Sequence, residues 1–251
     1  MEWYIYPLVV FAGAVAGFIN TLAGSGSAIT LGVLLLLGLP ADVANGTNRV
    51  GVVALGLGSM TALDKKLVQG LLTKGRYIIL TTFIGALVGA LVVVEINEAA
   101  LEKVIGGLMI VLLFVVLFNP KRWLQDSTQA LMRPTLLNVL LFFAVGFYGG
   151  FIQMGFGIFF LAAAVLVARY SLIDANIIKI VVTFLFAIPV LGIFIWYGDV
   201  QWELGLMLAV GQFVGGWLAA RYALGHPQAN VWIRRLLVVM IAVVIVKIFF
   251  M

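Results

Sequence analysis

Ten apolar segments follow one another along the 251 residues, separated by short polar stretches. Many approach the roughly 20 residues that a helix needs to cross a bilayer, and they lack the alternation of polar and apolar residues that marks an outer-membrane barrel. With 64% apolar and 10% charged residues, the chain does not have the composition of a soluble domain. We therefore predict an all-α integral membrane protein with segments at about 3–24, 27–38, 43–63, 76–95, 101–118, 136–153, 157–169, 174–197, 202–222 and 232–250.

A glycine-rich break interrupts the apolar pattern twice, about 130 residues apart, at 16–27 and at 145–157. Aligning the two copies places Gly26 on Gly155, and a small change of offset then places Asn45 on Asn176. Five segments fall in each half, so one half was duplicated. Interruptions at corresponding positions of two membrane halves indicate a transport site.

The second and seventh segments, 27–38 and 157–169, contain only about 12 and 13 residues. They are too short to span a bilayer comfortably, and each follows directly on a glycine-rich break. We expect them to be broken helices or re-entrant arms.

The charges of the connections predict how the two halves are oriented, because cytoplasmic loops collect lysine and arginine. The connection after the third segment of the first half is basic, with Lys65, Lys66, Lys74 and Arg76. The corresponding connection of the second half is acidic, with Asp199 and Glu203. The chain is therefore expected to form two inverted-topology repeats with both termini outside the cytoplasmic membrane.

The halves meet at a polar linker, 119–134, whose Lys121, Arg122 and Arg133 place it on the cytoplasmic side. We expect a first transmembrane repeat at 1–118 and a second at 135–251, which together make one multi-pass membrane domain.

The sequence lacks the residues that metal binding and nucleotide hydrolysis usually require. The chain has no cysteine and a single histidine, His226, in a polar loop, so we expect no metal and no cofactor. No nucleotide-binding loop is present, which leaves a gradient of protons or sodium ions as the energy source of any pumping. The net charge of +5 follows from membrane topology, so nucleic acid is not an expected partner.

The two breaks offer groups that bind anions. Gly24-Ser25-Gly26-Ser27 precedes a short apolar run, which leaves backbone N–H groups free at a helix N-terminus carrying about half a positive charge. The second break is expected to supply a matching helix end. Two further glycine pairs, Gly85 with Gly89 and Gly211 with Gly215, have the spacing that lets helices pack closely.

Two cations lie inside the apolar pattern. Arg49 stands about six residues into the third segment, and Lys179 occupies a similar position in the second half. A cation at such a depth costs at least about 2.5 kcal/mol on insertion scales, and an anionic ligand would offset that cost. The alternative is that both side chains reach the membrane surface or pair with Asp42 and Asp174.

We predict a substrate-binding site built from the two breaks, the cations and neighbouring polar side chains. Its candidate residues are Asn20, Thr21, Gly24, Ser25, Gly26, Ser27, Asn45, Thr47, Asn48, Arg49, Gln153, Gly155, Gly157, Asn176 and Lys179.

The order of these motifs resembles the sulfite exporter TauE/SafE family. The first half carries 17–26, then Leu39-Pro40, then 44–49, and the second half repeats a related motif over 146–157. The resemblance covers essentially the whole chain. It implies a transporter of small anions, often sulfur-containing ones such as sulfite or organosulfonates, and commonly an exporter.

The leading hypothesis is a secondary transporter that moves a small anion through the bilayer by alternating access. An anion-selective channel is the second hypothesis, because it would share a cationic site. A membrane enzyme acting on a lipid-linked phosphate is a weaker third, since acid–base or nucleophilic chemistry needs clustered catalytic side chains. The sequence specifies neither the coupling ion nor the oligomeric state.

Overall fold

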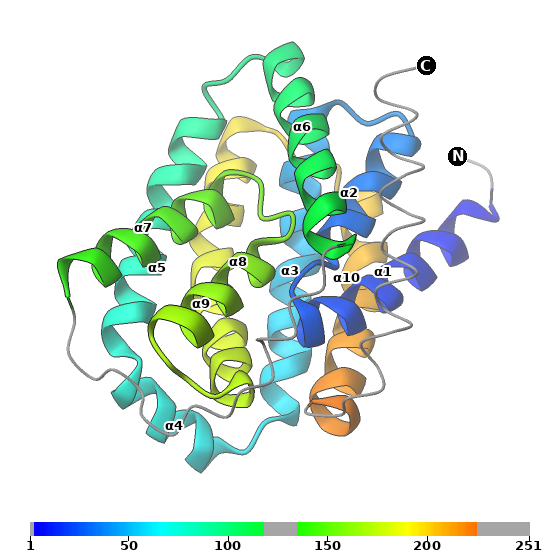
Figure 1. Cartoon of the computed structure of the whole chain (residues 1–251). Helices are drawn as coiled ribbons and strands as arrows, with labels where there is room; N and C mark the ends of the chain where they lie inside the picture. Colours follow the sequence, from blue (N-terminus) through cyan, green and yellow to red (C-terminus); the bar gives the residue numbers. More distant parts are fainter. Residues whose placement is uncertain (1–2, 118–134, 225–251) are drawn as a thin grey trace.

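The computed structural model describes residues 3–117 and 135–224, and these residues form helices and short connections without strands (Figure 1). Two π-helical turns, η2 and η3, continue α8 and α10 directly. In chain order the elements are α1 Ile5–Ala23, α2 Ser27–Leu36, α3 Ala41–Ala62, α4 Lys65–Lys74, α5 Arg76–Val93, α6 Glu98–Leu117, α7 Leu136–Phe151, α8 Phe156–Ala162, η2 Ala163–Val167, α9 Leu172–Tyr197, α10 Trp202–Leu218 and η3 Ala219–Ala223.

The predicted segments agree with these helices throughout the described ranges. The tenth segment, 232–250, and the linker 119–134 lie outside them. One connection was predicted wrongly, because the basic stretch after α3 contains the ten-residue helix α4. Asp64 caps this helix by accepting hydrogen bonds from the backbone N–H groups of Lys66 and Leu67. Val68 and Leu71 are buried on its inner face, so tertiary packing stabilises a helix too polar to be recognised as a membrane segment.

Among the helices of the described residues, four are long and apolar enough to cross a membrane: α1, α5, α9 and α10 with η3. Their outward faces are apolar, as Leu80, Ile84 and Leu91 on α5 illustrate with exposures of 59%, 45% and 53%. The buried side chains, by contrast, include an arginine, a lysine and several amides and hydroxyls. Apolar groups outside and polar groups inside are expected of a multi-pass membrane protein, and the all-α membrane fold class is confirmed.

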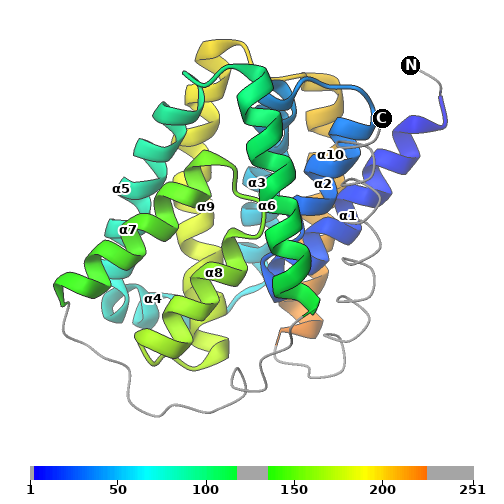
Figure 2. The same ribbon diagram turned by 45° about the horizontal axis from the view of Figure 1, so that its top comes forward.

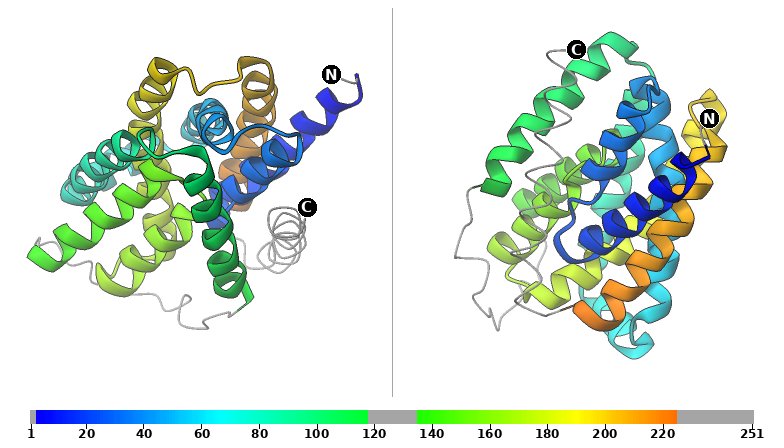
Figure 3. Two further views of the ribbon diagram at one scale, coloured as in Figure 1. Left: turned by 90° about the horizontal axis from the view of Figure 1, so that it is seen from above. Right: turned by 90° about the vertical axis from the view of Figure 1, so that its right-hand side faces the viewer.

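The long helices pack in the order α7, α5, α9, α3, α10, α1. Figure 3 shows α5 and α7 together on one side of the molecule and α1 and α10 together on the other. Each outer pair combines a first helix from one half with a helix late in the other half. The halves therefore exchange helices instead of forming separate lobes.

Glycines allow both outer pairs to approach at backbone distance. A Cβ atom on Gly211 of α10 would lie 2.0 Å from the carbonyl oxygen of Val10 in α1. A Cβ atom on Gly89 of α5 would likewise lie 2.0 Å from the carbonyl oxygen of Phe147 in α7. The predicted packing role of the spaced glycine pairs is thus confirmed.

The two glycine-rich breaks end helices α1 and α7 inside the protein (Figure 2). Gly24 closes α1 in the left-handed conformation, with a φ of 75°. After α7 the chain passes through Gln153 and Gly155, which also have positive φ values of 64° and 71°. As predicted, a short helix follows each break: α2 with ten residues and α8 with seven, the latter prolonged by η2. The inverted orientation of the halves remains a prediction from loop charge.

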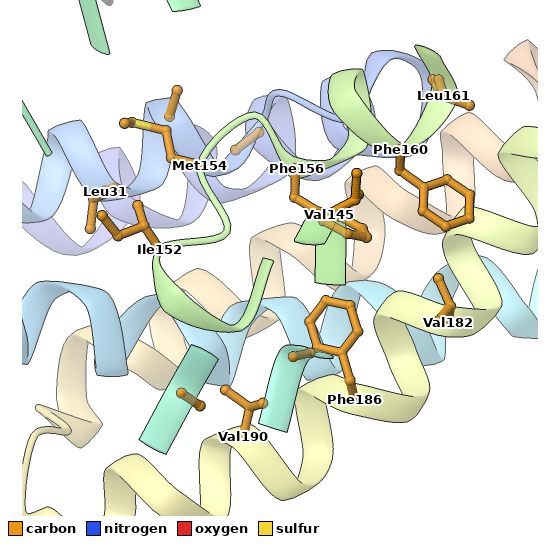
Figure 4. Close-up of a cluster of buried hydrophobic side chains, with 14 of the residues drawn as sticks. Leu31, Val145, Ile152, Met154, Phe156, Phe160, Leu161, Val182, Phe186 and Val190 are labelled. Carbon is orange, nitrogen blue, oxygen red and sulfur yellow. The ribbon is translucent and has the colours of Figure 1, made fainter. Parts of the chain in front are cut away.

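Apolar side chains hold the second break in place (Figure 4). Leu31 of α2 lies near Ile152 and Met154, on one side of the loop. Phe156 contacts Phe186 of α9 edge-on, with 5.3 Å between ring centroids. These contacts fix the loop between α2 and α9, so its polar residues have defined positions.

Candidate functional site

The two glycine-rich breaks touch each other at the centre of the site. The backbone N–H of Gly157 donates a hydrogen bond to the carbonyl oxygen of Gly24 at 3.0 Å. A Cβ atom on either glycine would lie 2.2 Å from the Cα atom of the other. Only glycine fits this contact, which joins the start of α8 to the end of α1.

Arg49 of α3 is fully buried and reaches the end of α7. Its guanidinium donates to the carbonyl oxygens of Gly149 at 2.8 Å and Gly150 at 2.7 Å. It also donates to the side-chain oxygens of Gln153 at 2.7 Å and Asn45 at 3.2 Å. The last carbonyls of a helix have no partners within the helix and carry partial negative charge, so Arg49 caps α7.

Lys179 of α9 does the same for α1. Its ammonium donates to the carbonyl oxygens of Asn20 and Thr21, both at 2.9 Å, and to the side-chain oxygen of Asn176 at 2.7 Å. Asn176 adds a hydrogen bond to the carbonyl oxygen of Leu22 at 3.3 Å. Asn45 makes the corresponding bond beside Arg49, to the carbonyl oxygen of Phe151.

Each half thus supplies an amide and a cation that cap the broken first helix of the other half. The expected alternative, in which the cations reach the surface or pair with Asp42 and Asp174, is wrong. Both side chains are at least 97% buried, with exposures of 0% for Arg49 and 3% for Lys179, and all their hydrogen-bond partners are neutral oxygens. The unpaired carbonyl oxygens at the ends of α1 and α7 accept hydrogen bonds from the two cations. They take the place of the carboxylates with which buried cations usually pair.

A small cavity lies beside the Gly24–Gly157 contact. It leaves about 20 Å³ for the centres of water-sized molecules, which is room for about one water. Its lining residues are buried except for the half-buried Asn20. They are Asn20, Thr21, Leu55, Gly56, Ser59, Gln153, Phe156, Gly157, Lys179, Ile180 and Thr183.

The structure brings some of the predicted site residues to this cavity and places others elsewhere. Asn20, Thr21, Gln153, Gly157 and Lys179 line it. Four others do not line the cavity but form the contacts between helix ends described above: Gly24, Asn45, Arg49 and Asn176.

The remaining candidates from the first break surround the start of α2. The side-chain amide of Asn20 donates to the hydroxyl of Ser27 at 3.4 Å. Ser25 is buried, and its hydroxyl has no hydrogen-bond partner. Gly26 packs against α1, where a Cβ atom would lie 1.9 Å from the carbonyl oxygen of Ala16. These residues set the position of α2 relative to α1.

Two of the candidates on α3 face other neighbours. Thr47 accepts a hydrogen bond from the backbone N–H of Gln201, before α10, at 2.9 Å. Asn48 accepts one from the hydroxyl of Thr30 in α2 at 2.5 Å, and its amide nitrogen is unpartnered. Gly155 supplies the left-handed turn before α8. Their observed contacts are therefore with helix ends and not with the cavity.

Ser59 of α3 lines the cavity but was not among the predicted site residues. Its hydroxyl lies 3.1 Å from that of Thr21, and both residues line the cavity. Ser59 follows Arg49 by ten residues on the same helix, about 2.8 turns, so the two side chains point about 80° apart. A hydroxyl within the otherwise apolar stretch at 50–60 was the signal that could have identified Ser59.

The comparisons with known proteins agree with this architecture. The family model described as sulfite exporter TauE/SafE matches residues 9–248. The chain belongs to the TauE/SafE family.

Several relatives match nearly all of the chain and are named as probable membrane transporter proteins. A protein of Sinorhizobium sp. named probable membrane transporter protein ORF9 is 28% identical over 89% of this chain and 85% of its own length. A Haemophilus influenzae protein named probable membrane transporter protein is 28% identical over 94% and 91%. The Escherichia coli K12 protein named probable membrane transporter protein YfcA is 29% identical over 97% and 89%. No solved structure matches this chain significantly. The protein is thus a membrane transporter of the TauE/SafE type.

Proposed function

We propose that this protein is a secondary transporter that exports a small sulfur-containing anion, sulfite or an organosulfonate, across the cytoplasmic membrane by alternating access. The observation that carries the proposal is the pair of buried cations, Arg49 and Lys179, at the junction of the two breaks. Within residues 3–117 and 135–224, neither cation has an anionic partner.

The charge balance of the interior favours an anion. No aspartate or glutamate is buried among the residues whose side chains the structure describes. The helix ends that Arg49 and Lys179 cap each carry only about half a negative charge, so each cation is partly compensated. Lys179 lines the cavity, and the remaining positive charge there attracts a small anion and repels a cation.

The size of the cavity favours a transporter over an open pore. Room for about one water is too little for an oxyanion with three oxygen atoms. Substrate entry therefore requires movement at the contact between Gly24 and Gly157. Separation of the breaks toward one side of the membrane at a time is the motion that alternating access needs.

The family supports the choice of substrate and direction, because its description names sulfite and export. The named relatives are membrane transporters, which accords with a non-enzymatic role. As part of the proposal, we extend sulfite export and the transporter role to this chain. The proposal also includes the cytoplasmic membrane as the location and a proton or sodium gradient as the energy source.

The experiment is uptake of radiolabelled sulfite, and in parallel of a small organosulfonate, into proteoliposomes with imposed pH or sodium gradients. The variant Lys179→Met removes the cavity cation, whereas Lys66→Met removes an exposed lysine on α4 as a matched control. We expect saturable flux in the wild type and in Lys66→Met, and at least a tenfold loss in Lys179→Met. Absence of flux for both anions under every gradient would overturn the proposal, and large non-saturating currents would favour a channel instead.

A further inference from the structure

Gln153 has an unusual backbone for its residue type. It lies just after α7 with a φ of 64°, a conformation that side chains other than glycine rarely adopt. Such a conformation is strained and persists only where the surrounding structure holds it. Gln153 is buried, with an exposed fraction of 2%.

The orientation of the Gln153 side-chain amide is fixed by Arg49. A guanidinium donates hydrogen bonds and cannot accept them, so the amide atom 2.7 Å from Arg49 is the oxygen, Oε1. Arg49 is itself held by the carbonyl oxygens of Gly149 and Gly150. The amide therefore has one defined orientation, with its nitrogen directed away from Arg49.

That nitrogen has no hydrogen-bond partner among the residues that the structure describes. Nε2 of Gln153 is buried and unsatisfied there, which is unfavourable. Gln153 lines the cavity, while Arg49 does not. The two ends of the amide therefore have different roles. The oxygen accepts a hydrogen bond from Arg49, and the two N–H donors are available to a ligand in the cavity.

We propose that Gln153 is a specificity-determining residue that donates hydrogen bonds to the substrate, and that Arg49 is a positioning residue which orients this amide without touching the substrate. The inference rests on the proposed function and deepens it. The ligand class is an oxyanion whose oxygens accept hydrogen bonds from Gln153 and share the cavity with Lys179. A cation brings no acceptor to these donors and is repelled by Lys179, so it is excluded.

Gln212 of α10 provides an internal comparison. It is buried, its Nε2 is also unpartnered, and it lies against Gly51, where a Cβ atom would be 2.2 Å from that nitrogen. It does not line the cavity. In the described part of the chain, an unsatisfied glutamine amide thus occurs in two places, and only the one at Gln153 is both oriented by a cation and adjacent to the cavity.

The test is Gln153→Glu, with Gln212→Met as the control, in the proteoliposome assay with sulfite. A carboxylate at position 153 still accepts from Arg49, so the fold is retained, but it presents an oxygen to the cavity in place of two donors. Loss of hydrogen bonds to a charged ligand predicts a rise in KM of about 10- to 100-fold or loss of flux. Gln212→Met, which removes the second unsatisfied amide without adding charge, is expected to stay within about threefold of the wild type.

A second variant covers the case in which Gln153→Glu does not fold. Gln153→Met keeps the length of the side chain, removes the donors without adding charge, and leaves Arg49 its bond to Gly149. The same rise in KM is expected, with a monodisperse protein by size-exclusion chromatography.

The outcomes separate this inference from the proposed function. Absence of sulfite and organosulfonate flux in the wild type would overturn both. Flux in the wild type with an unchanged KM in a folded Gln153 variant would overturn the inference alone. An equal loss in the Gln153 and Gln212 variants would also overturn it, because the effect would then follow any change to a buried glutamine.

Discussion

Gly157 donates its backbone N–H to the carbonyl oxygen of Gly24 at 3.0 Å, across 133 positions of the chain. This single bond joins the two glycine-rich breaks and closes the space beside the cavity. In the proposed transport cycle, this bond breaks or shifts when a substrate larger than water enters.

Gly157→Ala is expected to impair transport severely. The added Cβ atom would lie 2.2 Å from the Cα atom of Gly24, and overpacking of this kind costs about 1–3 kcal/mol. Flux in proteoliposomes and the thermal unfolding midpoint in detergent measure the two effects. Gly192→Ala on α9 is the control, because its Cβ atom would meet no heavy atom within 4 Å; wild-type behaviour of both variants would contradict the close contact.

Arg49→Met should destabilise the protein as well as abolish transport. The substitution leaves the carbonyl oxygens of Gly149 and Gly150 without their donors, in addition to the side chains of Asn45 and Gln153. At about 1–3 kcal/mol for buried groups left unsatisfied, the unfolding midpoint should fall by roughly 5–10 °C.

The matched control for this variant is Arg76→Met, which removes an exposed cation at the start of α5. Its unfolding midpoint should remain within about 2 °C of the wild type. An unchanged midpoint in Arg49→Met would show that the cap on α7 contributes nothing to stability.

The inverted orientation of the two halves can be tested by single cysteines, because the chain contains none. Lys66 of α4 and Trp202 at the start of α10 are both exposed and lie in or next to the connection after the third segment of their halves. A membrane-impermeant maleimide should label Lys66→Cys only from the cytoplasmic side and Trp202→Cys only from the outside. Labelling of both from one side would exclude inverted repeats.

Asp199, in the connection between α9 and α10, should make stability depend on pH. Burial, and to a smaller extent the nearby carboxylate of Asp42, raise the pKa of this side chain. The folded state therefore binds the proton more tightly than the unfolded chain, whose aspartates titrate near pH 4. The protonated side chain of Asp199 therefore contributes to the free energy of unfolding below about pH 4. This contribution is lost as the pH rises through the raised pKa of the folded state.

Asp199→Asn should consequently raise the unfolding midpoint at pH 7, and the gain over the wild type should shrink as the pH approaches 4. Thermal unfolding in detergent at both pH values measures this difference. A gain that is the same at pH 4 and pH 7 would mean that the ionised carboxylate is not its source.

Much of the fold follows from local patterns in the sequence. Apolar runs of suitable length become helices wherever they lie in a membrane protein, since the backbone must satisfy its hydrogen bonds internally. The breaks at Gly24 and Gly155 were recognisable because glycine adopts positive φ at little cost. Helix α4 was missed because its helical state depends on packing of Val68 and Leu71 that no local pattern shows.

The candidate site was predictable as a set of residues and less so as an arrangement. Gln153 and Lys179 do line one cavity, yet Thr47 contacts Gln201 at the start of α10. The polar residues of α3 lie on different faces of one helix, and their partners come from distant parts of the chain. Periodicity alone does not identify those partners.

The sequence by itself determined that this protein is a helical membrane transporter, because length, hydropathy and motifs are local properties of the chain, and it predicted two related halves with a cation in each. Only the tertiary structure decided what the cations do. Arg49 caps α7, 100 positions away, and Lys179 caps α1, 159 positions away. The freed carbonyls at the ends of broken helices are buried where only the other half can supply a donor, so this exchange exists only once the halves have packed together.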